Sequence, residues 1–299
     1  MFDFGYEPLP HDDSQYFKDI DTRNVYIPIG DVAAYHTYPK YHWVYNKIRL
    51  CEAQNIYAFP DGDENPPFPI FRKPICNLYG MSAGAEPIFN KEQYNKDYKP
   101  GYFLMPLLEG EHYTTDVAIS VGNIVWVKSM LCHKDEKGSF LMFEIMQTPS
   151  KIQNIINHWV NKHFNQYTGI LNFETIGLSI IECHLRMSIQ FVDLYGEGWL
   201  DAVVNLYDNK EWNFVDRAQV GYSIPLRVHT PGIYSFPEQS IKDAKKCCNS
   251  IQIFVSSTYN VKDDNCNDIH SYRLAVVNGF NQTQCEHALK ILSNNIIKS

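Results

Sequence analysis

The sequence has no long apolar run, no cluster of basic residues and no CxxC pair. No stretch approaches the roughly 18 consecutive apolar residues of a membrane span, and the acidic start, MFDFGYEPLPHDD, is unlike a signal peptide. Lysine and arginine are scattered and the formal net charge is −8, whereas a nucleic-acid groove normally has a basic stripe. We therefore expect a protein that binds neither membrane nor nucleic acid directly.

The cysteines lack the spacing of a zinc site, because the two closest ones are adjacent in the chain. They stand at positions 51, 76, 132, 183, 247, 248, 266 and 285. We expect free thiols in a reducing compartment, which predicts a cytoplasmic protein. Disulfides or a zinc knuckle are the alternative.

The remaining composition is that of an ordinary globular protein. Hydrophobic residues make up 44% of the chain and charged residues 20%, so a packed core is expected. A chain of 299 residues can form one large domain or two to three joined lobes. Segments with strand spacing and segments with helical spacing alternate, which predicts an α/β or α+β fold.

Strand-like alternation of apolar and polar residues is clearest in two hairpins. Residues 112–121 and 124–131 flank Gly122-Asn123, a hairpin signal, and a second strand pair is joined at Gly177. Strands are expected at residues 23–35 (with a turn), 70–75, 102–108, 169–176, 178–187, 221–228, 250–258 and 272–280.

Helical spacing appears first at residues 45–55, where Ile48, Leu50 and Cys51 share an apolar side and Asn46 can cap the first turn. Further helices are expected at residues 150–164, 198–208 and 283–296, with a short helix or turn at residues 90–98.

The densest chemical signal is GILNFETIGLSIIECHLR, residues 169–186. Period-two geometry places Glu182, His184 and Arg186 on one face of a strand, and Glu174 on the facing strand can converge with them. Two carboxylates and an imidazole suit a divalent ion, and a neighbouring arginine suits a phosphate. A solvent-facing polar stripe has the same spacing, so the pattern alone leaves both interpretations open.

The same segment resembles the signature of the ATP-grasp superfamily of carboxylate–amine ligase-like proteins. In that signature a Gly–aliphatic–x–Asn stretch precedes an acidic or Gln ligand, and a hairpin leads to (I/V)-E-(I/V)-N-x-R. The resemblance implies that Glu174 and Glu182 are metal ligands and that Arg186 contacts the transferring phosphate or the acylphosphate. His184 stands where the family usually has Asn, a ligand or neighbour of the metal, and imidazole should shift metal preference toward softer ions.

Two upstream lysines and a glycine-containing loop resemble the nucleotide-binding part of the same family. YNK supplies Lys47 at the start of a helix, and RKPICNLYGMSAG supplies Lys73, followed by Gly80 and Gly84. The resemblance implies that both lysines hold ATP phosphates and that the amides of the loop close over them.

The segment FLMPLLEGEHYTTDV resembles the hinge between the two lobes of the family. The resemblance implies that the Pro106 carbonyl accepts from the adenine amino group and that the Leu108 N–H donates to the ring. Glu111 matches the carboxylate that binds the ribose hydroxyls. Asp116 matches an acidic position of the next strand, and an exposed strand residue is an equal alternative.

The resemblance covers about residues 42–200 and implies an ATP-grasp fold, with two lobes that clamp the nucleotide between sheets. We expect a shortened N-terminal segment at residues 1–45, a nucleotide lid lobe at residues 46–105 and a C-terminal lobe with the metal site at residues 106–299. Family members usually carry a longer domain ahead of the lid, which helps to bind the acceptor. We therefore expect an acceptor pocket that is reduced, built by the C-terminal part, or completed by a partner or a second copy.

These assignments predict an ATP-dependent ligase that joins a carboxylate to an amine or similar nucleophile through an acylphosphate. Its cofactors would be ATP and Mg²⁺ or Mn²⁺, and its catalytic residues Arg186 and Lys73. Gln190, Asp193 and Tyr195 follow the metal strand and are candidates for the acceptor pocket. A catalytically reduced ATP-binding or regulatory module and a small-molecule kinase are the alternatives. Phrases such as WVYNK and HLRMSIQFVDLYGEGW are similar to a bacterial and phage-type ATP-grasp group.

Overall fold

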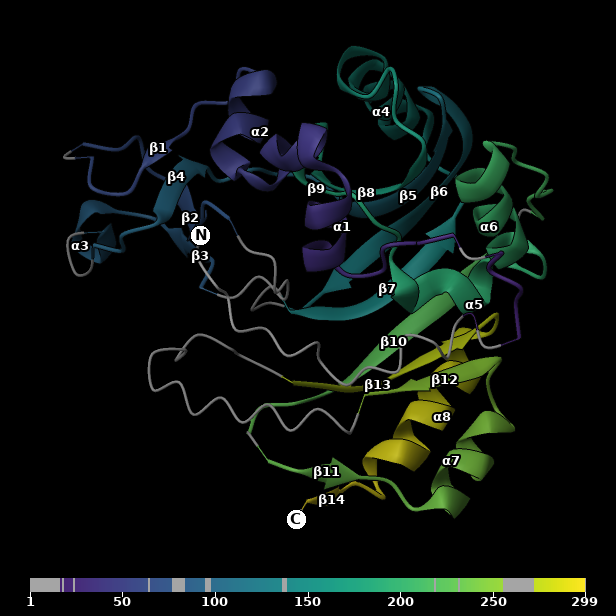
Figure 1. The fold of residues 1–299 in the computed structure, drawn as a ribbon. Helices are drawn as coiled ribbons and strands as arrows, with labels where there is room; N and C mark the ends of the chain where they lie inside the picture. The colour runs from purple at the N-terminus through teal and green to yellow at the C-terminus, as the bar shows by residue number, and fades with distance from the viewer. Residues whose placement is uncertain are drawn as a thin grey trace.

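Two antiparallel sheets form the frame of the molecule (Figure 1). The computed structural model describes residues 17, 19–23, 25–63, 65–76, 84–94, 98–135, 139–217, 219–230, 232–254 and 272–298. Within these residues the smaller sheet has four strands in the order β1-β4-β2-β3 and the larger sheet has eight, in the order β12-β13-β10-β7-β6-β5-β8-β9. Helices pack on both sheets, so the predicted mixture of helix and strand is confirmed as an α+β arrangement.

The small sheet lies between two apolar clusters because its side chains alternate between faces. Its strands are β1 (Phe59–Pro60), β2 (Ile70–Pro74), β3 (Glu86–Ile88) and β4 (Tyr102–Pro106). On β4, Leu104 packs with the cluster around α3 (Lys91–Tyr94), whereas Phe103 and Met105 pack with the cluster around α2 (Lys47–Ala53). As predicted, Asn46 caps α2, and its side chain accepts from the N–H groups of Ile48 and Arg49.

The large sheet is covered by helices on both faces. Its strands are β5 (His112–Ser120), β6 (Asn123–Lys134), β7 (Phe140–Met146), β8 (Gly169–Ile176), β9 (Ser179–His184), β10 (Gly221–Val228), β12 (Ser250–Ile253) and β13 (Tyr272–Gly279). One face packs on α4 (Ser150–His163), and the other on α5 (Val192–Tyr195) and α6 (Trp199–Asn209). At the far end, α7 (Glu238–Lys245) and α8 (Gln282–Ser293) cover β10 and β13 (Figure 1).

One face of β8 is apolar and the other carries polar side chains. Leu171 and Phe173 belong to the apolar cluster beneath α4, so Asn172 and Glu174 point to the other side of the sheet. On β9, Cys183 joins the same apolar cluster, and Glu182 and His184 point away from it. Asn172, Glu174, Glu182 and His184 are therefore on the face that lies opposite α4.

The N-terminal part differs from expectation. Residues 23–35 were expected to form a strand and a turn, but the structure has a helix, α1 (Asp31–Thr37), followed by a 3-10 helix at Pro39–Tyr45. Ala34 and the rings of Tyr35 and Tyr38 pack into the cluster beneath α4. This tertiary contact favours a helix where the local sequence pattern predicted a strand.

Two further elements, strand β7 and helix α7, were not expected. A short two-stranded sheet pairs β11 (Tyr234–Ser235) with β14 (Ile297–Lys298).

Among the described residues, the helices are all too short or too polar to cross a lipid bilayer.

Candidate functional site

Strands β8 and β9 bring two glutamates and a histidine together. Glu174 and Glu182 are direct cross-strand partners, and a β-bulge interrupts the pairing immediately after Glu174. Ligand atoms of Glu174, Glu182 and His184 all lie within 4.8 Å of one another. His184 Nε2 is 3.4 Å from Glu182 Oε2 and 3.9 Å from Glu174 Oε1. The hairpin register thus produces the convergence that the period-two spacing predicts.

Neighbouring cations hold the two carboxyl groups in the ionised form. Burial raises the pKa of Glu182, but Lys47, whose Nζ is 2.8 Å from Glu182 Oε1, helps to bring the pKa well below its usual range. Burial likewise opposes ionisation of Glu174, and the hydrogen bond with His112 at 3.2 Å helps to keep its pKa low. Two ionised carboxylates facing one another attract a cation.

His184 is itself part of this charge balance. Burial lowers the pKa of His184, but the carboxylates of Asp31 and Glu182 together raise it to about 9. The ring therefore carries a proton toward the glutamates near neutral pH, and a metal ion would have to displace that proton. Two carboxylates and one imidazole, partly buried and with their ligand atoms convergent, fit a divalent ion of the Mn²⁺ or Zn²⁺ type.

Asp31 is the residue that sequence reasoning missed. It opens α1, and its buried carboxylate contacts His184 Nδ1 at 3.0 Å and Arg186 Nη2 at 2.8 Å. Burial disfavours its ionisation, but Arg186 and His184 bring the pKa of this carboxyl below its usual range. Arg186, which lies two residues after the end of β9, is thus bonded to an acid from the N-terminal segment. No motif in residues 23–35 signals this contact, because it joins residues 155 apart in the chain.

Both predicted phosphate-binding lysines reach the same hairpin from the small-sheet side. Lys47 begins α2, and its N–H donates to Ile75 O just after β2. Lys73 lies on β2, and its Nζ donates to Ile181 O of β9 at 3.2 Å. Burial lowers the pKa of Lys73 to about 8, although Glu182 opposes the shift. Two ammonium groups therefore lie beside the convergent carboxylates.

The resemblance places two glycines in the loop after β2. Gly80 lies outside the described residues. Gly84 has φ +72°, and a Cβ there would lie 2.1 Å from the hydroxyl of Tyr102. Gly84 is therefore required for backbone geometry and close packing against β4, and its contact with phosphate stays a prediction.

The predicted hinge connects the two sheets. Pro106 ends β4, Leu108 packs on the apolar cluster of Phe103 and Met105, and Glu111 precedes β5. The backbone carbonyl of Glu111 accepts from Gly177 N at 2.9 Å, and its carboxylate accepts from the Tyr113 hydroxyl at 2.7 Å. The bond from Gly177 holds the hinge against the turn of the β8–β9 hairpin.

The segment after β9 forms hydrogen bonds with the large sheet, including Asp116 on β5. Asp116 is fully buried, so the alternative of an exposed strand residue is wrong. It accepts from the Tyr195 hydroxyl at 2.8 Å and from Ser188 N. Gln190 donates to Ser223, and Asp193 accepts from side chains of β12 and β13. These contacts anchor the segment to the sheet, and the role of Gln190, Asp193 and Tyr195 in an acceptor pocket stays a prediction.

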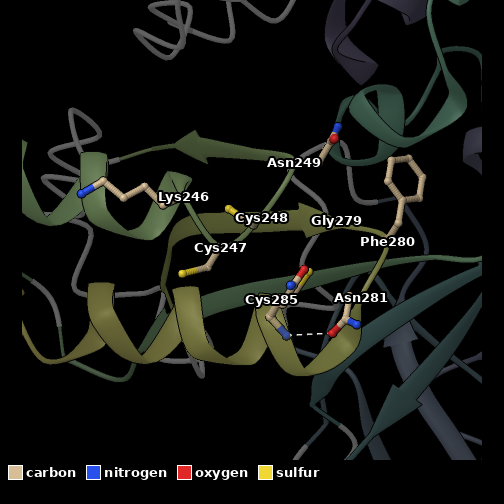
Figure 2. A pocket seen from close by; sticks show the side chains of 9 residues that line it. Lys246, Cys247, Cys248, Asn249, Gly279, Phe280, Asn281 and Cys285 are labelled. Atoms are coloured by element: carbon tan, nitrogen blue, oxygen red, sulfur yellow. Dashed lines mark hydrogen bonds between the residues drawn. The ribbon is translucent and has the colours of Figure 1, made fainter.

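A pocket of about 320 Å³ lies elsewhere, between the end of α7, β13 and the start of α8 (Figure 2). Cys247, Cys248 and Cys285 line it. Burial raises the pKa of Cys285 above its usual range and that of Cys248 to about 12, so these two thiols stay protonated and are poor nucleophiles and metal ligands.

No protein-family model matches the sequence, and no curated protein matches it either. Several solved structures share its fold. An L-amino acid ligase from Bacillus licheniformis superposes with a TM-score of 0.62 at 12% identity, covering 90% of this chain and 77% of that one. An N5-carboxyaminoimidazole ribonucleotide synthetase from Thermotoga maritima gives 0.57 at 11% identity, covering 98% and 81%. A phosphoribosylamine–glycine ligase from the same organism gives 0.54 at 14% identity, covering 90% and 76%.

The chain therefore has the fold of the ATP-grasp ligases, as the sequence predicted. Identities of 10–14% establish the fold alone, so the activity must be argued from the side chains of this site.

Proposed function

We propose that this protein is an ATP-dependent ligase that joins a carboxylate to an amine or similar nucleophile through an acylphosphate. The observation that carries the proposal is the meeting of Glu174, Glu182 and His184 with Lys47 and Lys73. The ligands come from the large sheet and the lysines from the elements of the small sheet. That is the distribution of charge needed to hold a metal and a polyphosphate together.

The site residues have separate roles in this proposal. Glu174, Glu182 and His184 would hold Mg²⁺ or Mn²⁺, which neutralises phosphate charge when bound. Lys47 and Lys73 would bind the ATP phosphates, with Gly80 and Gly84 in the covering loop. The hinge residues Pro106, Leu108 and Glu111 would bind adenosine through backbone groups and one carboxylate.

The reaction would proceed in two displacements. A carboxylate oxygen of the substrate attacks the γ-phosphorus, and the bond to ADP breaks. The amine nitrogen then attacks the acyl carbon, phosphate leaves, and the nitrogen loses a proton. Arg186 and Lys73 would stabilise charge on the transferring phosphoryl group, so catalysis rests on positioning and electrostatics.

We also propose the corresponding division of the chain, with a lid lobe at residues 46–105 and a lobe carrying the metal site at residues 106–299. The segment at residues 1–45 precedes them. The small sheet, which runs from Phe59 to Pro106, and the large sheet, which begins at His112, support this boundary.

A catalytically reduced ATP-binding module is the second candidate, and the charge balance of the site favours it. Lys47 and the protonated ring of His184 already neutralise Glu182 without a metal ion. A site whose charges are neutralised in this way can keep its geometry without a metal ion.

Turnover separates the candidates. The protein would be incubated with ATP, Mn²⁺ and a panel of amino acids and amines, and ADP and free phosphate would be measured. A ligase releases both, a kinase releases ADP and leaves phosphate on its product, and a reduced module releases neither. Glu182→Gln should lower turnover by about 100-fold or more. Glu144→Gln is the matched control, because Glu144 pairs with His133 at 3.2 Å on β6 and β7, outside the proposed ligand set.

A further inference from the structure

One carboxylate connects two parts of the proposed site. Asp31 Oδ1 lies 3.0 Å from His184 Nδ1, and Asp31 Oδ2 accepts from Arg186 Nη2 at 2.8 Å. The exposed fractions of the Asp31 and His184 side chains are 5% and 6%. A proposed metal ligand and the proposed phosphate-contacting arginine are therefore bonded to the same buried group.

The contact with His184 determines which ring nitrogen faces the glutamates. An ionised carboxylate can only accept a hydrogen bond, so Nδ1 must carry a proton. Nε2 is then the nitrogen that faces Glu182 Oε2 at 3.4 Å and Glu174 Oε1 at 3.9 Å. Carboxylates that bond the second nitrogen of a metal-binding histidine orient the ring and raise its basicity.

A tyrosine makes this arrangement rigid. The Tyr45 hydroxyl donates to Asp31 Oδ1 at 3.2 Å and accepts from Leu185 N, also at 3.2 Å. Leu185 lies between His184 and Arg186, so both the side chains and the backbone of this stretch are tied to the same N-terminal acid. All of these groups are buried or nearly so.

We propose that Asp31 is a positioning residue, which turns His184 Nε2 toward the metal and holds Arg186 beside it. The proposal rests on the proposed function of the site. It gives the N-terminal segment a part in building that site, although the described part of the segment adds no residue to the proposed ligand set. Loss of Asp31 would disturb the metal ligand and the arginine together.

The variant that tests this is Asp31→Asn. His184 bonds Oδ1 and Arg186 bonds Oδ2; in an amide of the same shape an NH2 group replaces one of these oxygens, so only one of the two contacts keeps its acceptor. Mn²⁺ affinity would be measured by electron paramagnetic resonance with a non-hydrolysable ATP analogue. We expect a loss of about 10–100-fold, the usual effect of removing a partner of a metal-binding histidine.

Asp61→Asn is the matched control. Asp61 pairs with Arg72 Nε at 3.1 Å, with side chains 1% and 2% exposed, in the small-sheet lobe and outside the ligand set. Its replacement should lower the melting temperature and leave Mn²⁺ affinity unchanged. If the two variants lose Mn²⁺ affinity equally, Asp31 has only a structural role.

The unaltered protein provides a second measurement that does not depend on folding of a variant. With ¹⁵N-labelled histidine rings and Zn²⁺, NMR should show a proton on Nδ1 of His184 and the metal shift on Nε2. Zn²⁺ bound through Nδ1, with the proton left on Nε2, would overturn the proposal. If the unaltered protein binds Mn²⁺ and nucleotide but Asp31→Asn binds them as well, only the role of Asp31 fails. If the unaltered protein binds neither, the proposed function fails with it.

Discussion

His184 stands where the resemblance to the ATP-grasp signature predicts asparagine, and its replacement by asparagine tests what this difference does. Because an amide oxygen is a harder ligand than imidazole, His184→Asn should retain activity and shift the preferred metal from Mn²⁺ or Zn²⁺ toward Mg²⁺. The asparagine N–H can still donate to Asp31, so the contact at 3.0 Å has a replacement. ADP release measured with each metal checks this. If the variant gains an ATPase activity that the unaltered protein lacks, the reduced-module hypothesis takes first place.

Lys73 offers a second prediction at the scale of one side chain. A charge-assisted contact to phosphate is worth roughly 1.5–3 kcal/mol, so Lys73→Ala should weaken ATP binding by about tenfold or more. The fold should survive, because burial already lowers the pKa of this ammonium to about 8 and makes its charge costly. Calorimetric titration with ATP and a thermal melt would be compared. Normal ATP binding combined with a much lower melting temperature would identify Lys73 as a structural residue.

At the scale of the element, the β8–β9 hairpin was predictable and the contacts of α1 were not. A short turn at Gly177 sets the register, and period-two alternation then places Glu182 and His184 on one face. Asp31 belongs to a seven-residue helix with little apolar periodicity. His184 and Arg186 are more than 150 residues away, and only the packed tertiary structure brings them to Asp31. The local pattern therefore predicted that Glu182 and His184 share a face, but it could not predict the buried acid that contacts His184.

Strand β5 carries a buried acid whose titration should affect stability. Burial raises the pKa of Asp116 to about 6, against the donors Tyr195 and Asn172. Between about pH 4 and pH 6 the folded state binds more protons here than the unfolded state, so this group makes the unfolding free energy fall as pH rises. The neutral side chain of Asp116→Asn removes that slope. Relative to the unaltered protein, its unfolding free energy should rise by up to about 3 kcal/mol from pH 4 to pH 7, which urea titrations at each pH would measure. If the unfolding free energies of the two proteins changed with pH in parallel, this prediction would be contradicted.

For the whole molecule, binding of a nucleotide by both lobes should stabilise the folded state by mass action. A ligand at 100 times its Kd adds about 2.7 kcal/mol, which corresponds to several degrees in melting temperature for a chain of this size. ATP with Mg²⁺ or Mn²⁺ should produce this shift, and GTP should produce a smaller one. Scanning calorimetry with each nucleotide at millimolar concentration checks the order. Absence of a shift with ATP and metal would remove the central proposal.

The proposed hinge explains why ATP should bind more tightly than GTP. Adenine offers an amino donor and a ring acceptor in the order that the Pro106 carbonyl and the Leu108 N–H would match, whereas guanine presents the reverse. The interaction uses backbone, so Leu108→Ala should leave ATP affinity nearly intact and cost only the packing of this half-buried side chain on Phe103 and Met105. Leu108→Pro removes the N–H and should abolish ATP binding. Leu107→Pro is the control, because Leu107 N donates to Pro69 O at 3.3 Å and not toward a nucleotide. If Leu108→Pro still binds ATP in calorimetric titration while remaining folded, adenine is not recognised at this hinge.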